Sequence, residues 1–110
     1  MNDRKLLGEL GENLAAAVLY AEGYEIVERN FRCPIGEIDL ICHKNDTIFF
    51  VEVKTRSLTD FGTPEEAVCR QKQLRIRRIA EYYQKIRRVD TFNISFQVFG
   101  ITIQQIENAF

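Results

Sequence analysis

Apolar residues recur along the chain first at helical and then at strand spacing. Between residues 3 and 22 they recur every three or four positions, which predicts an amphipathic helix. The apolar face of this helix is expected to consist of Leu6, Leu10, Leu14, Ala17, Val18 and Ala21. A second face, flanked by Glu12, is made of the small residues Gly8, Gly11 and Ala15. Glycine inside a helix costs about 1 kcal/mol relative to alanine, so the small-residue face predicts close packing against another backbone.

Alternating apolar side chains predict three strands, over residues 24–31, 35–43 and 47–56. Only the short turn 44–46 separates the second strand from the third, so we expect these two to form an antiparallel hairpin. Within the third strand, the sequence FFVEVKTR places Glu52 and Lys54 two positions apart. Residues two apart in a strand project from the same face, so these opposite charges are expected to point together.

A second helix is predicted from a well-marked start. Thr63 fits the N-cap, Pro64 the first helical position and Glu66 the acid of a capping box. The helix is expected to extend to about Arg88. Its inward-facing residues are expected to be Val68, Ile76, Ile79, Tyr83 and Ile86.

A final strand is predicted over residues 92–99, and Gly100 is expected to separate it from a short strand at 101–106. The order of elements is then α-β-β-β-α-β(β), which predicts an α/β fold with a central mixed sheet flanked by helices. A length of 110 residues, without repeats or linkers, predicts a single domain over residues 1–110.

The composition is ordinary for a soluble globular protein, with 45% hydrophobic and 28% charged residues. No apolar run approaches the roughly 18 residues that span a bilayer, and the N-terminal stretch lacks the apolar core of a signal peptide. Cys33, Cys42 and Cys69 are odd in number and show no CxxC spacing, which favours reduced thiols over disulfides or a zinc site. We therefore expect a cytoplasmic protein with no membrane contact.

Basic residues concentrate between residues 70 and 88, where eight of them accompany a single acid, Glu81. This segment carries +7 in a chain of net charge −1, so the remainder carries −8. Such a stripe is typical of a polyanion-binding face, although a solvated helix face is a common alternative. The scarcity of acids at i,i+4 spacing favours binding. By helical angle, the outward-facing members are Arg70, Arg77, Arg78, Lys85 and Arg88.

Acidic residues of the predicted hairpin indicate a metal site. If the strand register brings the charged faces together, Asp39 becomes a neighbour of Glu52, with Lys54 beside them. Neighbouring buried carboxylates repel unless something neutralises them, and Mg²⁺ prefers such oxygen ligands. Lys54 would then orient a water or stabilise charge that develops on a phosphate. The alternative is an exposed Glu52–Lys54 ion pair, but Asp39 within the apolar segment GEIDLI favours the metal.

Lys72 falls among the apolar residues of the second helix rather than on its basic stripe. A lysine in that position is costly unless its ammonium reaches a partner. Two interpretations stay open at this point. Either the side chain extends to the helix edge and reaches water, or it reaches the carboxylates or a phosphate.

The spacing of Asp39 and the segment Glu52-Val53-Lys54 resembles the signature of the PD-(D/E)xK nuclease superfamily, with Ile38 where that name has proline. The chain resembles even more closely the YraN-like family of small bacterial proteins. The matching segments include GEIDLI, FVEVKTR and the terminal IENAF, and together the matches cover nearly the whole chain. Archaeal Holliday-junction resolvases look similar in layout, with an added glutamate on the first helix where this chain has Glu12.

The resemblance implies a restriction-endonuclease-like core of the same element order. It implies Mg²⁺ or Mn²⁺ bound by Glu12, Asp39 and Glu52, with Lys54 as the catalytic lysine. A Val-Lys-Arg pattern of the family falls on Val68, Lys72 and Arg75 and adds the last two to the candidate nucleic-acid contacts. The chain departs from the family at Gln97, where relatives usually carry Asp, and around Gly100, where the turn looks shortened. These departures concern a late-strand contact rather than the metal ligands.

Three functions are compatible with these patterns. The first is a metal-dependent endonuclease acting on nucleic acid, with DNA expected and branched DNA a candidate substrate, working as a homodimer. The second is a non-catalytic nucleic-acid-binding or adaptor module with a nuclease-like fold. A cluster of acids would repel phosphate and weaken such a module, which favours the enzyme. The third, an α/β protein-interaction domain, leaves Asp39 and Lys72 unexplained.

Overall fold

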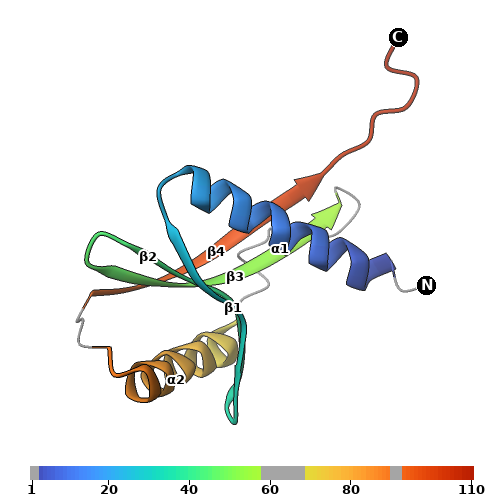
Figure 1. The fold of residues 1–110 in the computed structure, drawn as a ribbon. Coiled ribbons are helices and arrows are strands. Elements are labelled where there is room, and N and C mark those ends of the chain that lie inside the picture. Colours follow the sequence, from blue (N-terminus) through green and yellow to red (C-terminus); the bar gives the residue numbers. More distant parts are fainter. Residues whose placement is uncertain (1–2, 58–68, 90–92) are drawn as a thin grey trace.

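The computed structural model describes residues 3–57, 69–89 and 93–110 (Figure 1). Its elements are α1 (Asp3–Ala21), β1 (Glu25–Cys33), β2 (Gly36–Lys44), β3 (Thr47–Ser57), α2 (Arg70–Arg87) and β4 (Asn93–Ile103). This order confirms the predicted α-β-β-β-α-β arrangement, and the first three strands lie where alternation placed them. The predicted helix start at 63–68, with Thr63, Pro64, Glu66 and Val68, and the strand start at Phe92 lie outside the described residues.

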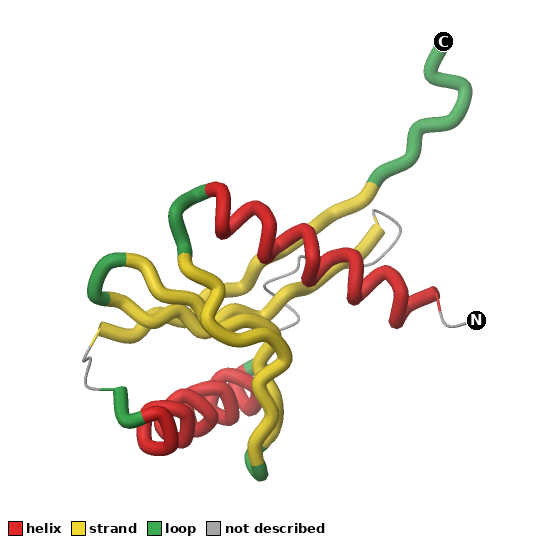
Figure 2. Tube along the Cα trace, in the orientation of Figure 1, coloured by secondary structure: helices red, strands yellow, loops and turns green. Residues whose placement is uncertain are grey.

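The four strands form one mixed sheet in the order β1-β2-β3-β4. β1, β2 and β3 pair antiparallel, which confirms the predicted hairpin, and β4 pairs parallel to β3. α1 covers one face of the sheet and α2 the other (Figure 2). Two parallel strands are usually joined by a crossover connection that contains a helix. In this chain α2 lies in the connection between β3 and β4.

α1 packs on the sheet through Gly11, Ala15 and Leu19, and not through the three leucines of the predicted apolar face. Ala15 and Leu19 are 0% and 3% exposed, and Gly11 is buried. The leucines of the predicted apolar face are about half exposed: Leu6 49%, Leu10 56% and Leu14 50%. A Cβ on Gly11 would overlap Thr55 Oγ1 of β3 and lie 3.1 Å from Thr55 Cβ. The helix therefore approaches the strand so closely that only glycine fits, and this approach decides which face is buried.

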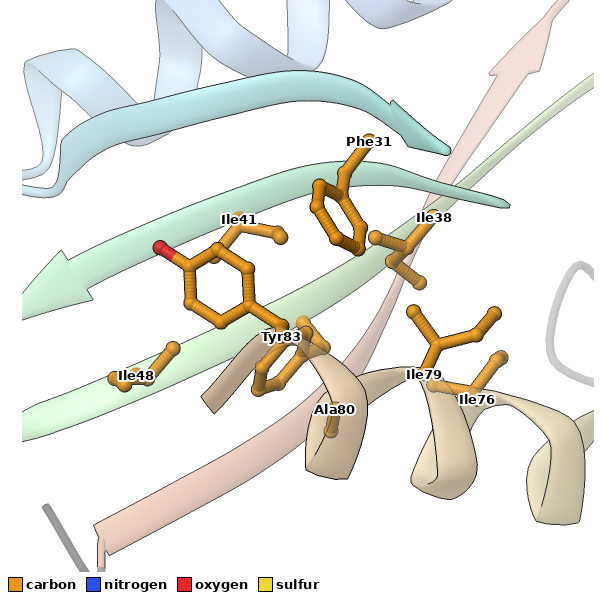
Figure 3. Packing of buried hydrophobic residues seen from close by; sticks show 9 residues of the cluster. Phe31, Ile38, Ile41, Ile48, Ile76, Ile79, Ala80 and Tyr83 are labelled. Atoms are coloured by element: carbon orange, nitrogen blue, oxygen red, sulfur yellow. The ribbon is translucent and has the colours of Figure 1, made fainter. Parts of the chain in front are cut away.

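α2 supplies the second core. Ile76, Ile79, Ala80 and Tyr83 are buried against residues of the first three strands (Figure 3). The strand residues are Phe31, Ile38, Ile41, Ile48 and Phe50. The Tyr83 ring meets the rings of Phe31 and Phe50 edge-on, with centroids 5.3 and 5.7 Å away, a geometry that aromatic pairs favour. Ile86 is 43% exposed, contrary to its predicted inward position.

β4 continues through Gly100, where the sequence predicted a break. Its parallel pairing with β3 runs without interruption from Asn93–Thr47 to Ile103–Ser57, and Gly100 pairs with Lys54. The glycines with positive φ in the described chain are Gly23 and Gly36, so Gly100 keeps a backbone that the ladder accepts. Residues 104–110 belong to no helix or strand and extend away from the sheet (Figure 1). Within the described residues, neither helix is long and apolar enough to cross a membrane.

The close approach of α1 can be tested with two glycines of the same helix. Gly11→Ala should lower the free energy of unfolding by about 1–3 kcal/mol, because the added methyl overlaps Thr55. Gly8→Ala is the matched control, since an added Cβ meets nothing within 4 Å and alanine favours the helix by about 1 kcal/mol. Urea denaturation measures both variants. Equal shifts of the same sign would contradict the predicted packing.

Candidate functional site

A pocket of about 450 Å³ opens between β2, β3 and α2. Its lining brings together four residues singled out from the sequence, Asp39, Glu52, Lys54 and Lys72, together with Arg75 at the rim. Asp39 comes from β2, Glu52 and Lys54 from β3, and the two remaining residues from α2. Charged groups that are distant in the sequence thus converge on one cavity.

The pocket exists because β2 leaves β3 at Asp39. Pairing between the two strands runs from Lys44–Thr47 to Leu40–Val51 and extends no further. At the next position the Asp39 side chain takes the place of a backbone acceptor, and its Oδ2 accepts a hydrogen bond of 2.7 Å from the Val53 backbone N–H. Asp39 therefore stands beside Glu52, the residue that the continued register would place opposite it.

Where β2 leaves β3, it also bends, and the bend changes the face of the sheet on which nearby residues lie. Strand alternation predicts that Ile38 and Leu40 share a face, but Ile38 packs in the α2 core and Leu40 in the α1 core. Asn30, next to Phe31 on the neighbouring strand, has a positive φ of 53°, which asparagine tolerates better than most residues. The two strands of the β1–β2 hairpin thus bend at Asn30 and Asp39, and the alternation of faces fails across that bend.

Asp39 is held in conditions that favour its protonated form. Burial, followed by the charges of Glu52 and Glu12, raises its pKa to about 7 from 3.8. The Val53 N–H and the Lys72 ammonium act in the opposite direction, and they do not prevent the rise. At neutral pH the protein alone therefore holds Asp39 near the midpoint of its titration, and a cation that binds there must displace a proton.

Glu52 is the one charged residue among those buried in the described chain, at 6% exposure. Lys72 Nζ lies 2.7 Å from Glu52 Oε2, which decides between the two interpretations left open for Lys72. Although burial lowers the pKa of Lys72, the hydrogen bond to Glu52 and the charge of that carboxylate raise it overall. The ammonium therefore reaches inward and neutralises the buried acid.

Lys54 has the opposite tendency. Burial lowers its pKa, and a hydrogen bond with Lys72 and the positive charge of that residue lower it further. The carboxylates of Glu52 and Asp39 act against this shift without cancelling it. Two amines that share a site cannot both hold a full charge cheaply. The proton favours Lys72, so Lys54 is the amine of the pair that loses its proton more readily.

Glu12 lies near this pocket without lining it. It is half-buried on α1, and its charge contributes to the raised pKa of Asp39. Among residues 3–57, 69–89 and 93–110, no group of three or more His, Cys, Asp or Glu side chains is close enough to hold a metal ion. Asp39 and Glu52 nevertheless fit a hard cation such as Mg²⁺ or Mn²⁺, which takes one or two carboxylates and completes its shell with water and phosphate oxygens.

The outward-facing basic residues predicted on α2 are all exposed: Arg70, Arg77, Arg78, Lys85 and Arg88. Arg75 is also exposed and connects this stripe to the pocket that it helps to line. Arg87 is occupied elsewhere, since it forms hydrogen bonds of 2.9 and 3.0 Å to Glu28 on β1. Glu37 also lines the pocket, and it pairs with Arg32 at 3.0 Å in an exposed ion pair.

A second pocket, of about 330 Å³, shares Glu52 and Ile76 with the first. Phe96, Gln97 and Arg77 contribute to its lining. The sequence singled out Gln97 as a departure from the family and Arg77 as part of the stripe, but it did not indicate this cavity. A signal was available, because alternation places Phe96 on the same face as Ile94. Recognising the pocket also requires the pairing of Phe96 with Phe50, and the sequence pattern does not specify a parallel register.

Comparison with known sequences finds relatives over most of the chain. The profile of the Uncharacterised protein family UPF0102 matches residues 11–101. A UPF0102 protein of Moorella thermoacetica is 44% identical over 94% of this chain and 87% of the relative. A UPF0102 protein of Alkaliphilus oremlandii is 45% identical over 96% of this chain and 98% of the relative. The similarity to the YraN-like family is thereby confirmed.

The raised pKa of Asp39 predicts how stability depends on pH in metal-free protein. The unfolded chain ionises near 3.8 and the folded chain near 7, so this group weakens the fold progressively as pH rises between those values. Asp39→Asn keeps an acceptor for the Val53 N–H but removes the ionisation. In EDTA, the stability of the variant relative to wild type should therefore increase by about 1–2 kcal/mol between pH 4.5 and 7.5, allowing for partial solvent screening. Parallel pH profiles of the two proteins would show that the shift is absent.

The buried ion pair predicts a second set of stabilities. Lys72→Met leaves Glu52 buried without its partner and should lower the free energy of unfolding by about 1–3 kcal/mol. Adding Glu52→Gln should restore most of that loss, because the uncompensated charge has gone. Arg32→Met is a matched control, since its pair with Glu37 is 80% and 54% exposed and should contribute far less. Additive effects of the first two substitutions in chemical denaturation would contradict the pairing.

Proposed function

We propose that this chain, which belongs to the UPF0102 family, is a metal-dependent nuclease that hydrolyses phosphodiester bonds of nucleic acid, with branched DNA as the leading substrate. The observation that carries the proposal is the convergence of Asp39, Glu52 and Lys54 on one pocket, with Lys72 inserted from α2. The resemblance of these residues to the PD-(D/E)xK signature supports it. We propose accordingly that the fold is restriction-endonuclease-like.

Asp39 and Glu52 are the residues that would hold Mg²⁺ or Mn²⁺ in this pocket. The ion, when bound, would polarise a phosphate oxygen and lower the pKa of a water. Asp39 must lose its proton to act as a ligand, so metal affinity should rise with pH through the region of its pKa, about 7. Glu12 supplies further negative charge near Asp39 without entering the pocket lining.

The two lysines divide the remaining work. Lys54 would orient the attacking water and stabilise the negative charge that develops on the phosphate, as the water oxygen adds to phosphorus and the bond to the leaving sugar oxygen breaks. The proton of the water would pass to solvent. Lys72 holds Glu52 at 2.7 Å and fixes the carboxylate in a buried position. Its positive charge also offsets the negative charge of the carboxylates, which would otherwise repel a phosphate.

The α2 stripe would guide the nucleic acid to the pocket. Arg75 at the rim and the exposed residues Arg78 and Lys85 are suited to backbone phosphates. Such contacts position a nucleic acid without selecting its sequence, and they release counterions. The lysines and Arg75 in the pocket, together with the basic helix beside it, would offset the repulsion between the carboxylates and an anionic substrate.

A second candidate is a nucleic-acid-binding or adaptor module that performs no chemistry. One observation favours it: Lys72 already neutralises Glu52, and the described residues offer no group of three acidic, histidine or cysteine ligands. In that case the same pocket is a stable ion-pair cluster and α2 alone contacts the nucleic acid. Binding would then not require Mg²⁺.

Cleavage assays with matched variants distinguish the two candidates. Wild-type protein, Lys54→Ala and Glu52→Gln are incubated with branched, nicked, single-stranded and duplex DNA and with RNA, in Mg²⁺ or Mn²⁺. We expect Lys54→Ala to reduce cleavage at least 100-fold while calorimetry shows that metal binding persists. Glu52→Gln should lose both. Lys44→Ala is the control, because Lys44 bonds the Glu22 carbonyl far from the pocket.

Two results would overturn the enzymatic proposal. Undiminished cleavage by Lys54→Ala would show that the activity does not use this amine. Wild-type protein that binds the substrates but cuts none of them would establish the non-catalytic module.

A further inference from the structure

We propose that the second pocket, bordered by Phe96, Arg77, Gln73, Gln97 and Glu52, is a subsite for one unpaired nucleobase. The proposal rests on the proposed function for its setting, because it places the base beside the phosphate that the first pocket would hold. It adds a property that the carboxylates and lysines do not supply, namely selection of substrates with unstacked bases over continuous duplex.

The two pockets meet at Glu52. The first, of about 450 Å³, holds this residue together with Asp39, Lys54 and Lys72, and the second, of about 330 Å³, lies on its other side. A volume of this order is at the lower end of the range for small-ligand pockets. A nucleotide whose phosphate entered the first pocket would therefore have a cavity of suitable scale next to it.

The aromatic ring in the second pocket is accessible and is backed by the core. Phe96 is 38% exposed, whereas Phe50, which stacks on it with centroids 5.8 Å apart and planes at 28°, is 1% exposed. Phe50 thus anchors the ring from the core. The Arg77 guanidinium carbon lies 4.9 Å from the Phe96 centroid, so the pocket brings an aromatic ring and a guanidinium group together. Aromatic rings and guanidinium planes are the surfaces on which proteins stack unpaired bases.

Side-chain amides give the pocket its polar edge. Gln73 from α2 and Gln97 from β4 both line it, and a carboxamide offers a hydrogen-bond donor and an acceptor together. Such groups match the edges of a base, which also carry donors and acceptors. Glu52 adds no net anionic field, because Lys72 neutralises it. The lining is therefore suited to a flat, polar and uncharged ring rather than to a second phosphate.

The ordinary alternative is that Phe96 only extends the core toward the surface and that Arg77 shields it. That arrangement would explain the ring contact but not the cavity beside it or the two amides at its edge. A base inside a duplex is already stacked and paired, and taking it out costs several kcal/mol. The subsite therefore predicts a preference for single strands, flaps and branch points.

The chain contains no tryptophan but four tyrosines, so Phe96→Trp introduces a single tryptophan at the subsite, whose fluorescence can be excited selectively. The titration is done in EDTA, which prevents cleavage. A single-stranded oligonucleotide should quench the fluorescence by at least a third, because a base stacks on the indole. An abasic oligonucleotide of equal length and charge, and a blunt duplex, should quench less than a third as much. Phe99→Trp is the matched control, since Phe99 lies on the same strand but packs in the α1 core.

A binding experiment complements the fluorescence. Phe96→Ala should bind the single strand about ten-fold more weakly than wild type, as expected for the loss of one base–aromatic stack. Its affinity for the abasic strand should be unchanged. Phe96→Tyr, which keeps the ring, should behave as wild type. These comparisons use anisotropy of a labelled strand and need no catalysis.

The outcomes separate the subsite from the proposed function. Equal quenching by intact and abasic strands overturns the subsite, as does unquenched Phe96→Trp that still binds and cuts single strands; the nuclease proposal then stands. Quenching specific to intact strands in a protein that cuts no substrate supports the subsite and overturns the nuclease. A protein that binds no nucleic acid overturns both.

Discussion

The hydrogen bond from the Val53 N–H to Asp39 Oδ2 is the interaction on which the site depends. When β2 leaves β3 after Leu40, the N–H of Val53 loses the strand that the ladder would otherwise offer, and an unpaired buried N–H is expensive. A carboxylate satisfies it and allows the strands to separate. The gap between the strands becomes the pocket. Asp39, which lies in this gap, is buried next to negative charges, and both effects raise its pKa to about 7.

The remaining charges form a balanced set around that gap. Asp39 and Glu52 face Lys54 and Lys72, and the proton distribution is not symmetrical, since Lys72 is drawn to Glu52 and the pKa of Lys54 falls. A pair of identical amines thus acquires two chemical characters from position alone. This asymmetry arises because α2 places Lys72 among its apolar residues, where the inward direction is the one that offers a partner.

Much of the scaffold follows from local pattern. Alternation located β1, β2 and β3, and the two-residue spacing of Glu52 and Lys54 put both side chains into one pocket. What local pattern missed depends on contacts between distant segments. The buried face of α1 is decided by the steric fit of Gly11 against Thr55, and not by the amount of apolar surface on its leucines. The exchange of faces between Ile38 and Leu40 comes from a bend shared with Asn30 on another strand. The continuity of β4 through Gly100 needs the parallel register with β3.

Glu52 occupies a position that no single strand pattern would reveal, because it borders two cavities with different chemistry. On one side it meets the acid and the amines, and on the other it closes a pocket with an aromatic ring and two amides. A residue in such a position cannot change without affecting both pockets. Its near-complete burial, at 6% exposure, requires a permanent counter-charge, and Lys72 supplies one from a helix that also carries Arg77 to the second pocket. α2 thereby contributes the counter-charge of one cavity and an arginine of the other, so its packing on the sheet shapes both cavities.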